Sequence, residues 1–164
     1  MDFRIIELQE TTIFGVSEVF DEREFASREE LRHVMWSEDC DDVPGQICEG
    51  RWNETGRYSY DGVWYGVWRN DRYMIGREKA CVKNEKLEKL IIPAGKYAAF
   101  TTERGGYAGE EIPKLWSLIF DSWLPDSGYE LRNNDIIEVL HLWNDKTERK
   151  RNRYYEIWIP VAEK

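Results

Sequence analysis

The order of strand-like and helix-like segments is the feature that most constrains the fold of this chain. The first half reads as strand, helix, strand, strand, and the second half repeats that order. Strands grouped in this way around two helices indicate an α+β fold made of two βαββ units, rather than a parallel doubly wound sheet. The expected elements are strands or strand pairs over residues 4–20, 63–69, 72–82, 95–102, 136–143 and 154–161, and helices over 28–38 and 109–124.

Local signals support both helices and one turn. Ser27 and Glu30 form a capping box at the start of the first helix. Asn70 and Asp71 tolerate the positive φ that a two-residue hairpin turn needs, so they are expected to join two strands. The second helix carries an apolar stripe, expected to be core, formed by Ile112, Leu115, Trp116, Ile119, Phe120 and Trp123.

Length and charge limit the classes of function. The 164 residues fit one domain, expected over 1–164. The formal net charge of -9 argues against direct nucleic-acid binding and favours cationic ligands in any focused cleft. No apolar run approaches the ~20 residues of a membrane span, and the chain opens on a strand-like run rather than a leader. With three unpaired-looking cysteines (Cys40, Cys48 and Cys81), these features predict a cytoplasmic protein.

Two segments between the expected elements carry their own predictions. Residues 39–60 form a connection longer than usual and contain Trp52, Tyr58 and Tyr60, so they are expected to be a lid or a binding loop. Residues 146–153 are basic and are interpreted as a solvated hairpin tip rather than an interaction patch.

No metal or cofactor is expected. The histidines, His33 and His141, have no acidic or cysteine partner at ligand spacing. The chain also lacks a GxSxG motif, a glycine-rich phosphate loop and a calcium-binding loop.

Five sequence pieces, taken in order, resemble the GyrI-like family, which includes AraC-type effector-binding domains. They are residues 92–100 (IPAGKYAAF), 105–106 (GG), 123–129 (WLPDSGY), 137–139 (IEV) and 156–161 (EIWIPV). The resemblance is strongest over residues 86–161. It implies two βαββ units related by a pseudo-twofold axis, with a central ligand groove between them.

The resemblance also implies a central acidic residue. Many regulators of this family hold lipophilic cations with a carboxylate among aromatic rings, and its position resembles Glu138 here. Independently, Glu138 interrupts an apolar run over residues 136–140, where an unpaired buried carboxylate is costly. Hydrolytic relatives pair a glutamate with a tyrosine, which gives Glu138 and Tyr97 as the catalytic candidates if this chain is a hydrolase.

Aromatic residues supply the other ligand-binding candidates. Alternation along a strand places Trp64 and Trp68 on one face and Tyr65 on the other, but it does not say which face lines the groove. Glu156 and Trp158 share one face of the last strand and are further candidates for the wall of the site. The favoured interpretation of Glu156 is structural, as a cross-strand partner of a basic residue.

Three functions stay open at this point. The favoured one is binding of a lipophilic, cationic aromatic molecule, as in the effector-binding domains of bacterial transcription regulators. The alternatives are hydrolysis of an electrophilic, cyclopropane-type toxin, and a gyrase-inhibitor-like interaction with a protein partner. The expected strands begin too early for a helix-turn-helix domain, so a complete transcription factor is not expected.

Overall fold

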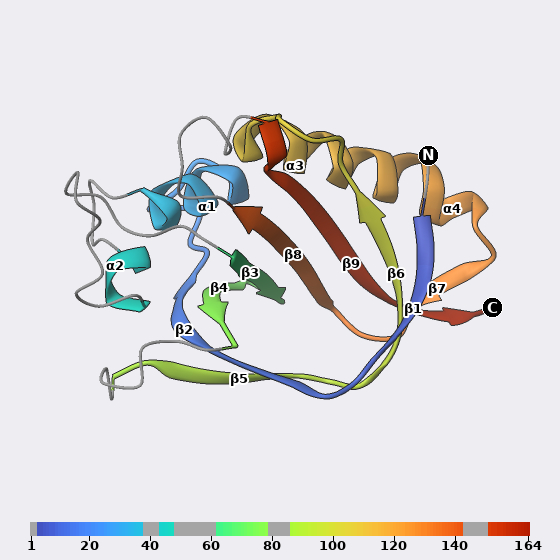
Figure 1. The fold of residues 1–164 in the computed structure, drawn as a ribbon, viewed down its shortest axis with the longest axis horizontal. Helices are drawn as coiled ribbons and strands as arrows, with labels where there is room; N and C mark the ends of the chain where they lie inside the picture. The colour runs from blue at the N-terminus through green and yellow to red at the C-terminus, as the bar shows by residue number, and fades with distance from the viewer. Residues whose placement is uncertain (1–2, 38–42, 48–61, 79–85, 143–150) are drawn as a thin grey trace.

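The computed structural model describes residues 3–37, 43–47, 62–78, 86–142 and 151–164 (Figure 1). The predictions for the 39–60 connection, for the three cysteines and for most of the 146–153 segment fall largely or wholly outside these residues. The strands of the described part are β1 (Phe3–Leu8), β2 (Thr11–Val19), β3 (Gly62–Arg69), β4 (Arg72–Arg77), β5 (Glu88–Ile92), β6 (Gly95–Thr101), β7 (Tyr129–Leu131), β8 (Asp135–Leu142) and β9 (Tyr154–Glu163). The helices are α1 (Arg28–Trp36), α2 (Val43–Ile47), α3 (Ala108–Ser117), the π-helical stretch η1 (Leu118–Trp123) and α4 (Leu124–Asp126).

The strands form one antiparallel sheet with the order β1-β6-β9-β8-β3-β4-β2-β5, and β7 pairs with β9. The first unit is β2, α1, β3 and β4, and the second is β6, α3, β8 and β9. Counted outward from the central β3–β8 pair, the strands of the first unit follow as β3-β4-β2 and those of the second as β8-β9-β6, so each unit places its second, third and first strand in that order. The two βαββ units therefore meet at β3 and β8, and the predicted duplicated α+β fold is confirmed.

Two nearly continuous strand pairs draw the edges of the sheet together. β1 lies at one edge beside β6, yet it runs directly into β2 near the opposite edge. In the same way β5 runs through Pro93 and Ala94 into β6. These pairs curve along the side of the sheet that lies away from α1 and α3, so the sheet curls into a half-barrel (Figure 1).

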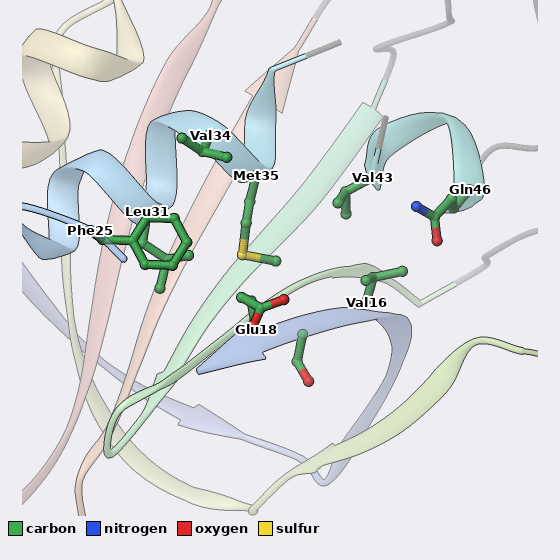
Figure 2. Close-up of a pocket in the computed structure, with 9 residues that line it drawn as sticks. Val16, Glu18, Phe25, Leu31, Val34, Met35, Val43 and Gln46 are labelled. Atoms are coloured by element: carbon green, nitrogen blue, oxygen red, sulfur yellow. The ribbon is translucent and has the colours of Figure 1, made fainter. Parts of the chain in front are cut away.

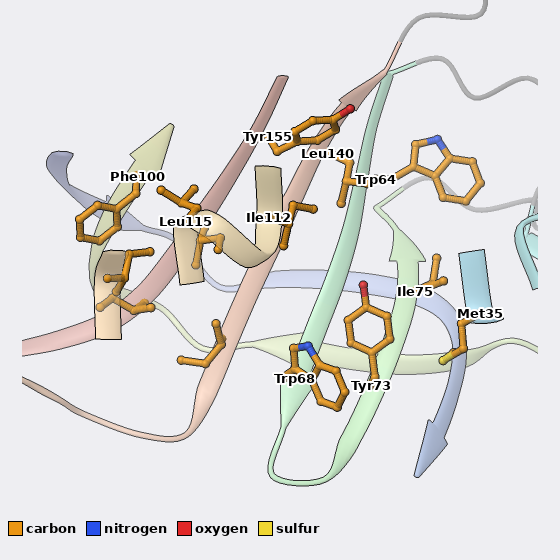
Figure 3. Close-up of a cluster of buried hydrophobic side chains, with 14 of the residues drawn as sticks. Met35, Trp64, Trp68, Tyr73, Ile75, Phe100, Ile112, Leu115, Leu140 and Tyr155 are labelled. Atoms are coloured by element: carbon orange, nitrogen blue, oxygen red, sulfur yellow. The ribbon is translucent and has the colours of Figure 1, made fainter. Parts of the chain in front are cut away.

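The curled sheet separates two cores. The helix-side core lies between the sheet and α1 and α3, and it includes Leu31, Trp64, Tyr73, Phe100, Ile112 and Ile157 (Figure 3). The inner core fills the curl and includes Ile13, Tyr65, Met74, Leu90, Tyr97 and Val139. Successive residues of a strand alternate between these two cores, which fixes the side on which each candidate site residue lies.

The helices follow their sequence signals with local differences. The Ser27 side chain accepts a hydrogen bond from the Glu30 amide as predicted, whereas the Glu30 carboxylate accepts from the Ala26 amide instead of closing the box on Ser27. The second predicted helix spans α3, η1 and α4. In η1 the Leu124 amide donates to the Ile119 carbonyl, five residues earlier, so the helix is widened there.

Several strand boundaries differ from the predictions. The 4–20 segment is two strands, β1 and β2, which join different parts of the sheet. β5 and β7 were not predicted, because short edge segments with mixed polarity carry little periodic signal. Asn70 has a φ of 56° in the β3–β4 turn, in agreement with the expected hairpin. Within the described residues, none of the helices has both the length and the apolar character needed to cross a membrane.

Candidate functional site

Glu138 lies at the centre of the molecule. It belongs to β8, its Cα partner across the β3–β8 pair is Gly66, and its side chain points to the helix side of the sheet. Its exposed fraction is 0 %. The carboxylate is therefore cut off from bulk water, and the groups around it decide its chemistry.

Four donors satisfy the Glu138 carboxylate. Arg32 binds both oxygens through its planar fork: Nε donates to Oε1 at 2.9 Å, and the second nitrogen donates to Oε2. The Tyr73 hydroxyl donates to Oε1 at 2.8 Å, and the Trp116 indole nitrogen donates to Oε2 at 2.8 Å. Each carboxylate oxygen thus accepts one bond from a cation and one from a neutral aromatic side chain.

Three rings surround the Arg32 guanidinium. Its central carbon lies 6.0 Å from the ring centroid of Trp68, 5.9 Å from that of Tyr73 and 6.0 Å from that of Trp116. These distances are at the outer limit of cation–π attraction. We call this set, made of Glu138, Trp68, Tyr73 and Trp116, the aromatic cage.

The electrostatics of the aromatic cage keep Arg32 charged and Tyr73 neutral. Burial acts to lower the pKa of Arg32, but the Glu138 charge and hydrogen bonds outweigh it, and the net pKa is raised. Burial, together with the nearby Glu138 charge, raises the pKa of Tyr73 well above its ordinary value. Tyr73 is therefore a hydrogen-bond donor to Glu138 throughout the physiological pH range.

Backbone geometry makes room for this arrangement. A Cβ at Gly66 would lie 2.1 Å from the Tyr73 hydroxyl oxygen and 3.1 Å from Oε1 of Glu138. Trp36, at the end of α1, donates its indole N–H to the same hydroxyl at 2.9 Å. Glycine at position 66 is thus the residue that lets Tyr73 reach under Glu138.

Different elements contribute the members of the site. Arg32 and Trp36 stand four residues apart on α1 and so lie on one side of the helix. Trp116 comes from α3, and the β3–β4 hairpin supplies Trp68 and Tyr73, whose rings lie 4.6 Å apart (Figure 3). The site therefore joins both βαββ units, and α1 and α3 close over it.

The other predicted tryptophan on this face has a packing environment of its own. Trp64 is fully buried in the helix-side core, 5.8 Å from the ring of Trp36, and the Arg77 guanidinium lies 4.9 Å from the Trp64 centroid. The structure thus assigns Trp64 and Trp68 to the Glu138 face and answers the question that alternation left open.

The remaining predicted residues lie on the opposite face. Tyr65, Tyr97 and Trp158 pack in or against the inner core, and Glu156 lies beside Trp158. The Tyr97 hydroxyl donates to the Pro93 carbonyl at 2.7 Å. Tyr97 and Glu138 were expected to share a pocket, and this expectation is wrong. Strand alternation turns the two side chains to opposite sides of the sheet.

Glu156 has its own set of partners. It accepts from Arg4 at 2.7 Å, its other oxygen lies 2.7 Å from Nε2 of His141, and the Trp158 indole donates at 3.3 Å. Burial acts to raise its pKa, but the bonds from His141, Arg4 and Trp158 prevail and lower it to about 2. The predicted neighbours Glu156 and Trp158 are thus joined in a charged cluster at the edge of the inner core.

A hollow lies on the far side of α1 from α3. It has a volume of about 340 Å³ and lies between α1, α2 and β2. Leu31, Val34 and Met35 line it from α1, and Val16 and Glu18 line it from β2 (Figure 2). None of the residues in the aromatic cage lines this hollow.

The sequence did not identify Arg32, Trp36 or Tyr73 as site residues, and it placed Trp116 in the core. The sequence held one signal for Arg32, which is a charged residue within the segment that carries the apolar positions Leu31 and Met35 of α1. Among the described residues, no group of three His, Cys, Asp or Glu side chains is placed to hold a metal ion.

Comparison with known proteins identifies the family. Residues 1–162 match the model of the GyrI-like small molecule binding domain. A protein of Erwinia billingiae named "DNA gyrase inhibitor" is 26% identical over 122 residues, which cover 66% of this chain and 75% of that protein.

Solved structures agree with that match. The structure of SAV2435 bound to tetraphenylphosphonium has a TM-score of 0.62 at 13% identity and covers 99% of this chain and 94% of that one. The EcmrR C-terminal domain has a TM-score of 0.57 at 16% identity and covers 99% and 98%. The family model matches nearly the whole length, and the chain therefore belongs to the GyrI-like small molecule binding domain family.

Proposed function

We propose that this protein binds a lipophilic aromatic cation at Glu138, with the rings of Trp68, Tyr73 and Trp116 around the positive charge. The observation that carries the proposal is that this buried carboxylate already holds a cation, the Arg32 guanidinium, among these three rings. A ligand cation would take the place of that guanidinium.

The chemistry of the site supports a cation over an anion. Glu138 supplies the only acidic group of the aromatic cage, and the ring faces add attraction of about 0.5–2 kcal/mol each to a desolvated cation. An anion would be repelled both by the carboxylate and by the π-electron faces of the rings. The formal net charge of -9 adds a long-range attraction for cations.

A relative provides a probe for this proposal. SAV2435 has the same fold and was solved bound to tetraphenylphosphonium, a cation wrapped in four aromatic rings. Similarity of fold does not show that this chain binds the same ligand, so tetraphenylphosphonium serves only as a test compound. The biological role that follows is sensing or sequestering such a compound, in the manner of an effector-binding domain.

Catalysis is the weaker alternative. The hydrolase hypothesis needed Tyr97 beside Glu138, and these side chains lie on opposite faces of the sheet. Moreover, each carboxylate oxygen of Glu138 already accepts two hydrogen bonds, from Arg32 and from Tyr73 or Trp116, so neither oxygen is free to accept a proton from a water molecule.

The test is a tryptophan-fluorescence titration with tetraphenylphosphonium and with neutral triphenylphosphine oxide. We expect saturable quenching by the cation only, and a loss of that binding in Glu138→Gln. The matched control is Glu156→Gln, which makes the same chemical change in a buried carboxylate of the opposite face. Equal binding of both compounds, or equal loss in both variants, would reject Glu138 as the binding residue.

A further inference from the structure

The geometry of the Arg32–Glu138 pair indicates which class of cation the aromatic cage binds. We infer that the cage binds planar guanidinium or amidinium groups more tightly than ammonium groups, and that Arg32 is a tethered competitor which a bound cation displaces. This inference rests on the proposed function, because it names the ligand class of the same site.

The hydrogen-bond geometry favours a planar cation. Two nitrogens of Arg32 donate to the two oxygens of Glu138 in a fork-to-fork pair. A guanidinium or amidinium presents two parallel N–H groups in one plane, which matches a carboxylate, whereas an ammonium is a compact point charge. Tyr73 and Trp116 already fill the remaining acceptor positions on Glu138, one on each oxygen.

The rings favour the same class. A delocalised planar cation is weakly hydrated and loses less than an ammonium when it enters a dry site between aromatic faces. Glu138 is 0 % exposed and Arg32 is 8 % exposed, so the exchange takes place away from bulk water. An aryl amidine or aryl guanidine would place its charged group on Glu138 and its ring beside Trp68 or Trp116.

The position of Arg32 makes it a competitor. It stands on α1, a helix of nine residues that contacts α3, so we expect its exit to shift α1 away from α3. The hollow of about 340 Å³ lies on that other side of α1, lined by Leu31, Val34 and Met35 (Figure 2). The helix therefore has space to move into when a ligand takes Glu138.

Competition has a thermodynamic consequence. A ligand binds only the fraction of molecules in which Arg32 has left Glu138, so its apparent affinity falls by that fraction. Removal of the guanidinium should leave a vacant cage that small free cations of the right shape can fill.

Chemical rescue tests the inference directly. The variant Arg32→Ala is heated in matched concentrations of methylguanidinium, acetamidinium, ethylammonium and tetramethylammonium chlorides. We expect the two planar cations to raise its Tm by a few degrees above the two ammonium salts, with no such difference in the wild-type protein. The matched control is Arg28→Ala, which removes a half-exposed arginine of the same helix that pairs with Asp71 and lies over Trp68.

The outcomes separate this inference from the proposed function. Equal effects of all four salts on Arg32→Ala, or the same rescue in Arg28→Ala, would overturn the specificity for planar cations. Binding of tetraphenylphosphonium that depends on Glu138 would then still support the proposed function. Conversely, rescue of Arg32→Ala by the planar cations, without binding of tetraphenylphosphonium, would support the planar-cation cage and reject tetraphenylphosphonium as a ligand.

A second measurement covers the case in which Arg32→Ala does not fold. Hydrogen exchange of the wild-type protein is compared with and without benzamidine. We expect benzamidine to speed exchange in α1 while it protects α3 near Trp116. Unchanged exchange in α1 at saturating benzamidine would overturn the displacement of Arg32.

Discussion

Arg32 and Glu138 form a two-point ion pair at the junction of the two βαββ units, 106 residues apart in the sequence. Arg32 comes from the helix of the first unit, and Glu138 comes from β8, the strand of the second unit that pairs with β3. Because both side chains are buried, removal of either one leaves the other without its ion-pair partner inside the protein. The pair therefore joins the two units, and it is the observation on which the proposed cation site rests.

The two charges should depend strongly on each other for stability. Arg32→Met leaves Glu138 buried without its counter-ion and should lower the free energy of unfolding by about 3 kcal/mol or more. Arg32→Met combined with Glu138→Gln removes both charges and should recover much of that loss. Urea unfolding of the wild type, both single variants and the double variant measures the coupling; additive losses would contradict it.

Gly66 and Tyr73 should also be coupled. Gly66→Ala places a Cβ against the Tyr73 hydroxyl, which would displace it from Glu138, so we expect a loss of about 1–3 kcal/mol. Tyr73→Phe removes the hydroxyl and should make the added alanine less costly than in the wild-type background. Thermal unfolding of the four proteins measures this, and an equal cost of Gly66→Ala in both backgrounds would argue against the contact.

Glu156 should make the protein sensitive to acid. Its pKa in the folded state is lowered to about 2 from an ordinary value of 4.5, so its stabilisation is present above pH 4.5 and is lost as the pH falls toward 2. The shift corresponds to about 3 kcal/mol at neutral pH. Glu156→Gln should be less stable at pH 7 and should lose less between pH 4.5 and 2. A parallel pH profile of unfolding for both proteins would contradict this assignment.

Tyr97 should be irrelevant to the ligand. Tyr97→Phe removes a hydrogen bond to the Pro93 carbonyl and should cost about 1 kcal/mol of stability. Since the ring lies in the inner core, tetraphenylphosphonium affinity should stay within twofold of the wild type. A large loss of affinity in Tyr97→Phe would restore the hypothesis that Tyr97 and Glu138 share a site.

The sequence was informative where the signal is local or periodic. Ser27 marked the start of α1, Asn70 marked the hairpin turn, and the alternation of Trp64, Tyr65 and Trp68 correctly separated two faces. Glu138 was identified because its position resembles the central carboxylate of the family and because a charge within an apolar strand is costly without a partner. Each of these features depends on residues that are close together in the sequence, so the sequence alone is enough to predict it.

The partners of Glu138 were harder to predict. Arg32, Tyr73 and Trp116 lie 106, 65 and 22 residues from it, and only the packing of α1 and α3 over the sheet brings them together. Tyr97 was paired with Glu138 because hydrolytic relatives of the family use a tyrosine and a glutamate together, but the register of β6 with β9 turns Tyr97 inward. The facing of a strand depends on its register, and register is a tertiary property.

The most direct test of the account compares two variants that differ only at Glu138. Tetraphenylphosphonium affinity is measured for Arg32→Met and for Arg32→Met with Glu138→Gln, so that the competing guanidinium is absent from both. We expect the first to bind at least as tightly as the wild type and the second to bind about tenfold or more weakly. Equal affinities of the two variants would contradict the claim that Glu138 holds a cationic ligand.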